Sequence, residues 1–307
     1  MKKIVLQIAL TNVCPLNCSY CCMNFSSEED NKRYKNNILL DRIVNLINYL
    51  IDRGYYVEFG SGWGEPLLIF NQIKYIFDHI ERRDNINFEL LSSFAFDSKN
   101  NYKSVFTQLD KYQDLFEYYK IPYSVRWSIH TEYLSTNEQI HSHYQLLNSK
   151  INSKFIPMIM MNTKKNIWQF KFLKNKINNL EYHLILDNEG NCPLLADLTD
   201  LELNILKSMP YFVRGAHIVD RIRNKNFSFT GTLCHLDNLI AIMPSGRVVK
   251  CINDIYQFPQ KNFRDSNVKL LTEVSNEYVE NLGISNSLCK HKECNICATD
   301  PVDVYDT

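Results

Sequence analysis

The first 220 residues alternate between short apolar segments typical of strands and longer segments typical of helices. In the stretch 40–53, for example, Leu40, Ile43, Ile47 and Leu50 recur at helical spacing. This alternation predicts an α/β fold with a mainly parallel sheet joined by crossover helices. The expected strands are 3–11, 55–59, 87–91, 123–129, 155–160 and 182–186, and the expected helices are 40–53, 69–83, 101–120, 137–148 and 168–178.

The sequence changes character in its last third. A further helix is expected over 200–209, and from about residue 225 the strand–helix alternation stops. Two apolar segments, 239–243 and 247–250, flank Pro244-Ser245-Gly246, which predicts a β-hairpin with Gly246 in the turn. We therefore expect two domains, an α/β domain over 1–220 and a small α+β domain over 221–307.

The charge balance and the apolar stretches limit the kinds of partner. Thirty-four basic and 34 acidic residues give a formal net charge of zero, which argues against a nucleic acid or a membrane surface as partner. The apolar stretches are too short to span a bilayer, and the N-terminus lacks the pattern of a signal peptide. The expected location is the cytoplasm.

Ten cysteines are many for such a chain, because a reducing cytosol disfavours structural disulfides and clustered cysteines there more often bind metal. Cys14, Cys18 and Cys21 form a C-x3-C-x2-C loop directly after the first expected strand. Three thiolates at this spacing can bind three irons of one [4Fe–4S] cube and leave the fourth iron open. The alternatives are a zinc knuckle, for which Cys22 is a poorly placed fourth ligand, and cysteines packed as small hydrophobic side chains.

The loop, together with its position after strand one, resembles the motif of the radical S-adenosylmethionine (SAM) superfamily, over about the first 190 residues. A second resemblance is the segment 61–66, Ser-Gly-Trp-Gly-Glu-Pro, which looks like the family's Gly-Gly-Glu-Pro segment at the end of strand two. Trp63 stands where the first glycine of that pair is usual. The resemblance implies a partial (β/α)6 barrel that binds SAM on the open iron and produces a 5′-deoxyadenosyl radical.

The resemblance also implies a set of SAM contacts. Gly64 and Glu65 are expected near the SAM amino group, Tyr20 near the adenine, and polar residues at later strand ends near the carboxylate and ribose. These later residues are Ser92 with Ser93, Ser128 with His130, and Asn162.

Five cysteines from residue 234 onward form a second group. Cys234 and Cys251 flank the expected hairpin, and Cys294 and Cys297 form a C-x2-C pair, so four thiolates could hold a complete [4Fe–4S] cube. This pattern resembles the Twitch domain, a shortened SPASM domain with one auxiliary cluster. Cys289 could replace one of the four, and a structural zinc site is the alternative.

Two fates of a substrate radical are open. Transfer of its electron to the auxiliary cluster would give a dehydrogenation or a crosslink, and return of a hydrogen atom from a protein thiol would give an epimer. Cys192, in a loop after the sixth expected strand, is the candidate thiol donor, although Cys22 and Cys289 are also left over.

The substrate class is the least constrained part of the hypothesis. Resemblance to radical SAM/Twitch proteins implies a ribosomally made peptide, with a carbohydrate or aminocyclitol as the alternative, and a flavodoxin- or ferredoxin-type electron donor. A cluster-bearing redox or scaffold protein without SAM chemistry is the alternative from another class, against which the intact Glu65 and the three-cysteine loop speak.

Overall fold

The structure, a computed structural model, describes most of the first 185 residues and shorter parts of the remainder. The described residues are 2–11, 13–16, 18–19, 21, 37–61, 64–95, 102–185, 194, 198–208, 238–250 and 269–284. The chain divides into two compact units: the first contains residues 1–125, 152–154 and 238–285, and the second contains 126–151, 155–237 and 286–307. The predicted domain boundary at residue 220 lies outside the described residues.

The first unit is built on a sheet with the strand order β3-β2-β1-β7-β8-β9. Strands β1, β2, β3 and β7 run parallel, with Leu6 opposite Phe59 and Ile240, whereas β8 and β9 are antiparallel additions. The strands are β1 (Lys2–Ile8), β2 (Tyr55–Ser61), β3 (Ile86–Ser92), β7 (Leu239–Ile242), β8 (Arg247–Val249) and β9 (Lys269–Leu270).

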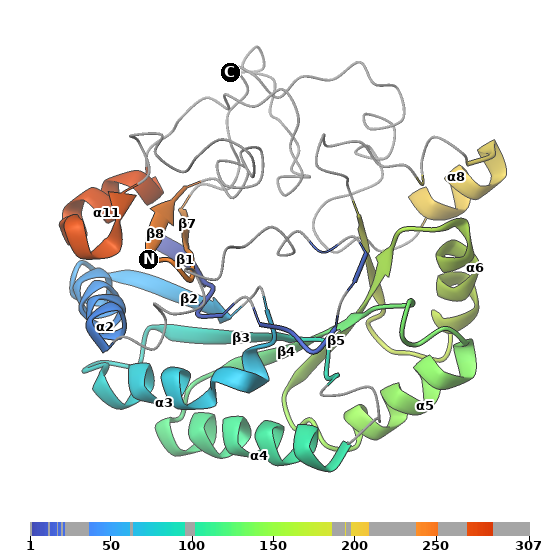
Figure 1. The fold of residues 1–307 in the computed structure, drawn as a ribbon, viewed down its shortest axis with the longest axis horizontal. Helices are drawn as coiled ribbons and strands as arrows, with labels where there is room; N and C mark the ends of the chain where they lie inside the picture. Colours follow the sequence, from blue (N-terminus) through green and yellow to red (C-terminus); the bar gives the residue numbers. More distant parts are fainter. Residues whose placement is uncertain are drawn as a thin grey trace. The chain divides into compact units, whose positions relative to one another are not determined.

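Three helices cover the same side of β1 to β3 (Figure 1). They are α2 (Asn37–Asp52), α3 (Phe70–His79) and α4 (Tyr102–Tyr119), and the 3-10 helix η2 (Pro66–Ile69) leads into α3. Aromatic rings form the core between these layers: Phe88 lies 5.0 Å from Phe59 and 4.8 Å from Phe116 between ring centroids. Burial of such large apolar side chains is the main force that holds the helices on the sheet.

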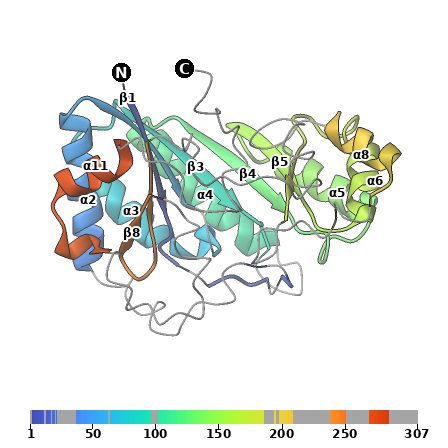
Figure 2. The same cartoon turned by 90° about the horizontal axis from the view of Figure 1, so that it is seen from above.

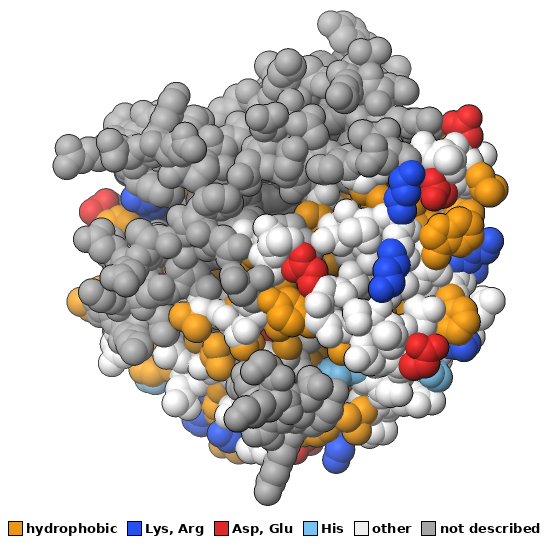
Figure 3. Space-filling view, turned by 45° about the vertical axis from the view of Figure 1, so that its right-hand side comes forward, with side chains coloured by type: hydrophobic (Ala, Val, Ile, Leu, Met, Phe, Trp, Pro, Cys, Tyr) orange, Lys and Arg blue, Asp and Glu red, His pale blue; other side chains and the backbone are white. Residues whose placement is uncertain are grey.

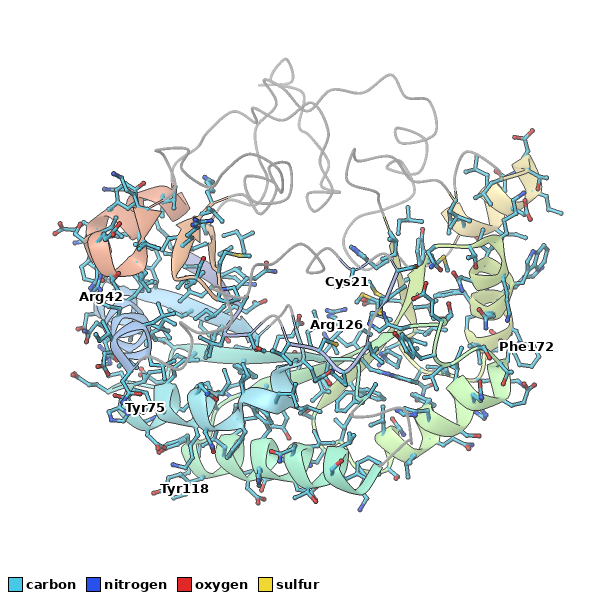
Figure 4. The ribbon with its side chains drawn as sticks, in the orientation of Figure 1. Cys21, Arg42, Tyr75, Tyr118, Arg126 and Phe172 are labelled. Carbon is cyan, nitrogen blue, oxygen red and sulfur yellow. The ribbon has the colours of Figure 1, made fainter. Side chains whose placement is uncertain are left out.

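The C-terminal segment of the first unit adds η3 (Leu271–Glu273) and α11 (Asn276–Ile284), and α11 lies beside α2 in Figures 1 and 2. Polar contacts attach this segment to α2 and β2. The Arg42 guanidinium donates to the Val274 carbonyl oxygen at 2.9 Å, and the Glu280 carboxylate accepts from the Tyr49 and Tyr55 hydroxyls at 2.7 and 2.8 Å. The side chain of Arg42 is marked in Figure 4. Residues about 230 positions apart are thus held in one unit.

The second unit continues the strand–helix pattern, with the strand order β6-β5-β4. Strand β4 (Tyr123–Ile129) starts in the first unit and enters the second at Arg126. Trp127 on β4 stacks on His143 of α5, so α5 packs against this strand. The further elements are α5 (Asn137–Asn148), β5 (Lys154–Met161), α6 (Lys164–Leu173), β6 (Glu181–Leu184) and α8 (Asp200–Lys207).

The mostly parallel α/β class is confirmed, and so is the hairpin with Gly246, whose φ of 82° suits a residue without a Cβ. Several expected boundaries were wrong, among them the start of α2, which begins at Asn37 rather than residue 40. Strand β1 ends at Ile8 rather than residue 11, because its pairing with β2 ends at Gln7 and its pairing with β7 ends at Ile8. Helix α3 ends at His79 rather than residue 83, since Ile80 is extended and the Arg83 guanidinium donates to the Phe77 carbonyl oxygen at 2.7 Å.

Both ends of α6 were also wrong, because the helix runs from Lys164 to Leu173 rather than over 168–178. The Asn166 side-chain oxygen accepts from the backbone N–H of Thr163 at 2.9 Å, and this cap begins the helix one turn early.

The described surface mixes apolar and charged side chains (Figure 3). Among the described helices, none is long and apolar enough to cross a membrane.

Candidate SAM and iron–sulfur site

The cysteine loop follows directly from β1. Cys14, Cys18 and Cys21 form no disulfide bond, and the Cys21 N–H donates to the Cys18 carbonyl oxygen at 3.1 Å, so these two cysteines share one turn. The Thr11 hydroxyl oxygen accepts from the Val13 N–H at 3.0 Å and shapes the entry to the loop. Figure 4 marks Cys21.

The environment of Cys14 disfavours a lone thiolate. Burial raises the pKa of the Cys14 thiol to about 11, a backbone hydrogen bond from Leu16 opposes this, and the charges of Glu65 and Cys21 raise it further. Metal binding to such a thiol displaces its proton, because the positive charge of the metal stabilises the thiolate.

The donor set fits an iron–sulfur cube. Within the described residues, no three His, Cys, Asp or Glu side chains gather closely enough to hold one metal ion. A [4Fe–4S] cube makes a different demand, because each of its irons takes its own cysteine ligand. Three reduced thiols on one loop, with Cys21 near enough to act on the charge of Cys14, meet that demand.

The turn after β2 packs directly on the entry to the cysteine loop. Gly64 has a φ of 67°, and a Cβ there would lie 2.5 Å from the Thr11 carbonyl oxygen, so the position admits only glycine without a shift of backbone. The next N–H, that of Glu65, donates to the Val13 carbonyl oxygen at 2.9 Å. The ends of β1 and β2, with their predicted functional motifs, are therefore one connected structure.

Glu65 is fully buried beneath this turn. Its carboxylate accepts hydrogen bonds from the Ser92 hydroxyl, from the hydroxyl and N–H of Ser93, and from the Leu67 N–H. Burial raises the pKa of Glu65, although these hydrogen bonds oppose the shift. The buried Tyr112 hydroxyl donates to the Pro66 carbonyl oxygen at 2.7 Å and secures the turn from the side of α4.

Thr11, Val13 and Tyr112 were missed by sequence reasoning. Threonine, valine and tyrosine are ordinary in such segments, and their contacts with the turn depend on which strand ends become neighbours. The glycine and proline around Glu65 were the only local signal that this turn is special.

Two predicted SAM contacts belong to the second unit. Ser128 is buried on β4, and Asn162 directly follows β5. The Asn162 N–H donates to the Asn166 side-chain oxygen at 3.0 Å, which joins it to the cap of α6. Their contacts with SAM stay predictions, as do those of Gly64, Glu65 and Ser92.

Other predicted site residues lie outside the described residues. They are Tyr20, Cys22, Trp63, Cys192, Cys234, Cys251, Cys289, Cys294 and Cys297.

A buried polar group also occupies the second unit. Arg126 on β4 pairs with Glu181 on β6 at 2.7 Å (N to O). Burial, and secondarily the charge of Arg126, lowers the pKa of His183 to about 4. Arg126 therefore has an acidic partner within the protein.

One family model matches part of this chain, and several solved structures are similar to it. Residues 8–112 match the sequence model of the radical SAM superfamily. The chain is also similar in structure to native anSMEcpe with bound AdoMet, that is, SAM: the TM-score is 0.51 at 15% identity, over 89% of this chain and 82% of that chain. The hexahistidine-tagged form of anSMEcpe with bound AdoMet gives a TM-score of 0.53 at 15% identity, over 91% and 77%.

Native anSMEcpe with bound AdoMet and Kp18Cys peptide is similar as well, with a TM-score of 0.51 at 14% identity, over 90% of this chain and 81% of that chain. At these identities the likeness establishes the fold alone. The comparison with curated proteins found no match.

Proposed function

We propose that this chain is a radical SAM enzyme that abstracts a hydrogen atom from its substrate, starting from the match of residues 8–112 to that superfamily. When bound, the four-iron cluster and SAM supply a reductively generated 5′-deoxyadenosyl radical. The observation that carries the proposal is the packing of the cysteine loop on the turn at Gly64 and Glu65. The cysteine loop, which would bind the cluster, and the turn that resembles a SAM-binding segment lie about 50 residues apart in the sequence. Their contact is what the proposal requires, because SAM would bind to the open iron of the cluster.

The chain's own residues bind and orient these groups. The cluster would be held by the thiolates of Cys14, Cys18 and Cys21. Because Gly64 has no Cβ, the turn can lie close to the loop entry. In the proposal, Tyr20 stacks on the adenine, and Ser128 and Asn162 bind the polar parts of SAM.

We place a second, fully ligated [4Fe–4S] cluster on Cys234, Cys251, Cys294 and Cys297, in a Twitch-like C-terminal domain. The confirmed hairpin β7–β8 supports this, because Cys234 precedes it by a few residues and Cys251 follows it by two. Four thiolates satisfy such a cluster without an outside ligand.

The proposed substrate is a ribosomally made peptide. Support comes from the fold shared with anSMEcpe, a structure of which contains bound AdoMet and Kp18Cys peptide. The product is an epimer if the Cys192 thiol returns a hydrogen atom to the substrate. It is a dehydrogenated or crosslinked peptide if the second electron leaves to the auxiliary cluster. The proposed reductant is a cytoplasmic flavodoxin- or ferredoxin-type protein.

Anaerobic reconstitution tests the proposed function. The iron-loaded protein, incubated with SAM and dithionite, is expected to form 5′-deoxyadenosine and methionine, measured by liquid chromatography and mass spectrometry. The control is the triple variant Cys14→Ala, Cys18→Ala, Cys21→Ala, which should form neither product. Absence of both products from fully iron-loaded wild-type protein would refute radical SAM activity.

A peptide reaction run in deuterated water distinguishes epimerisation from oxidation of the substrate radical. Solvent deuterium at a stereocentre, lost in Cys192→Ala, indicates epimerisation. A mass loss of two hydrogens indicates oxidation.

A further inference from the structure

The Glu65 carboxylate has no acceptor position left for a ligand. Oε1 accepts from the Ser92 hydroxyl at 2.6 Å and from the Leu67 N–H at 3.2 Å. Oε2 accepts from the Ser93 hydroxyl at 2.6 Å and from the Ser93 N–H at 3.1 Å. An ionised carboxylate offers about four lone-pair sites, and four donors from the protein occupy them.

The two serines are committed to the same contact. A hydroxyl has one proton to donate, and both Ser92 and Ser93 donate theirs to Glu65. Their oxygens also accept from the backbone, Ser92 from the Phe94 N–H at 2.9 Å and Ser93 from the Ala95 N–H at 3.3 Å. Together they fix the chain as it leaves β3.

On its other side, Glu65 is attached through its backbone. The Glu65 N–H donates to the Val13 carbonyl oxygen, and the preceding Gly64 packs against the backbone of Thr11. The carbonyl oxygen of the following Pro66 accepts from the Tyr112 hydroxyl. A side chain anchored at the end of β3 therefore fixes a turn whose backbone touches the entry to the cysteine loop. The turn can then present backbone groups to a ligand while the carboxylate stays beneath.

We propose that Glu65 is a positioning residue: its carboxylate joins the turn after β2 to Ser92 and Ser93 and makes no contact with SAM, and Ser92 serves Glu65 rather than the cofactor. This rests on the proposed function for the identity of the ligand. It assigns to Glu65 and Ser92 a different role from the SAM contacts expected from the sequence.

A double-mutant cycle on SAM binding tests the proposal. The variants are Glu65→Gln, the pair Ser92→Ala with Ser93→Ala, and all three together, each measured by calorimetric titration of SAM into iron-loaded protein without reductant. Each of the first two is expected to raise the Kd for SAM about tenfold, as loss of one or two buried hydrogen bonds does. The combined variant should also lie about tenfold above wild type, because both changes break one connection.

Direct contacts would give other results. If Glu65 and Ser92 each bound SAM, the factors would multiply to about a hundredfold in the combined variant, and the proposal would fail. It would fail equally if the serine variants left the Kd unchanged while Glu65→Gln raised it. Glu81→Gln, which changes an exposed carboxylate, should retain the wild-type Kd.

Amide hydrogen exchange of the iron-free protein gives a readout that needs neither SAM nor activity. In Glu65→Gln, the amides of Leu67 and Ser93 should exchange faster than in wild type. The amide at position 65, which donates to the Val13 carbonyl oxygen, should also exchange faster. Unchanged exchange at these amides would overturn the positioning role. If wild-type protein binds no SAM, the proposed function fails and takes the SAM part of this inference with it, while faster exchange would still establish the connection within the protein.

Discussion

At the residue scale, three histidines of the second unit have pKa values lowered to about 4: His130, His143 and His183. Burial is the main cause in each case. The charge of Glu132 opposes it at His130, and that of Arg126 adds to it at His183. Each imidazole is therefore neutral in the folded protein at neutral pH, because its charged form would lose more solvation than it regains.

We predict that stability falls with acidification between about pH 6.5 and pH 4, and that His143→Phe weakens this dependence. The unfolded chain binds protons at histidine in this range and the folded protein does not, so the free energy of unfolding rises with pH. At pH 5 the loss at one such histidine is about 2 kcal/mol relative to pH 8. Phenylalanine keeps a ring against Trp127, on which His143 stacks at 5.0 Å between centroids.

The measurement is urea unfolding of the iron-free protein at pH 8 and pH 5. The difference between the two pH values should be about 2 kcal/mol smaller in the variant. An equal difference in both proteins would show that His143 is not neutral in the fold.

At the element scale, the site depends on how closely the exits of β1 and β2 approach each other. Gly64 makes this approach possible, since any Cβ would meet the backbone of Thr11. The hydrogen bond from Glu65 to Val13 then links the two segments. A clash with backbone cannot be relieved by a side-chain rotation, so a side chain added at Gly64 would displace an entire loop.

We predict that Gly64→Ala lowers the free energy of unfolding by about 3 kcal/mol, because backbone strain and a clash with Thr11 add together. The matched control is Gly54→Ala. Gly54 also has a positive φ, 81°, but a Cβ there has nothing within 4 Å, so only the backbone strain of about 1 kcal/mol is expected. Urea unfolding measures both, and equal losses would contradict the close packing at Gly64.

At the scale of the whole molecule, sequentially distant segments share the first unit. Strand β7 pairs with β1, and α11 is attached to α2 through Arg42 and to β2 through Glu280. The proposed auxiliary cysteines at 234 and 251 thus flank a hairpin that belongs to the same sheet as the strand leading to Cys14.

We predict two independent clusters in the reconstituted chain. Wild-type protein should bind about eight irons, and the triple alanine variant of Cys14, Cys18 and Cys21 about four. Cys234→Ala with Cys251→Ala should also leave about four, with SAM binding retained. Iron and acid-labile sulfide assays measure these values. Four irons in wild type and none in the triple variant would exclude the auxiliary cluster.

Local patterns predicted the elements well where the signals are local. Strand β4 and helix α5 have the expected bounds, and α5 begins with a Thr136–Gln139 capping box that is visible in the sequence. Prediction failed at the ends of β1 and α3 and at the start of α6. The end of β1 depends on where its partner strands stop pairing. The end of α3 depends on the hydrogen bond from Arg83 to the Phe77 carbonyl oxygen, and the start of α6 depends on the Asn166 cap.

The sequence by itself determined the α/β class and the spacing of the three cysteines, because periodicity and ligand spacing are properties of neighbouring residues. It also marked Gly64 and Glu65 as special. Only the tertiary structure decided what the Glu65 carboxylate binds, since Ser92 and Ser93 become its neighbours through the pairing of β2 with β3. The physical reason is that a buried carboxylate must accept hydrogen bonds from nearby donors. Here those donors lie at the end of a neighbouring strand and are distant in the sequence.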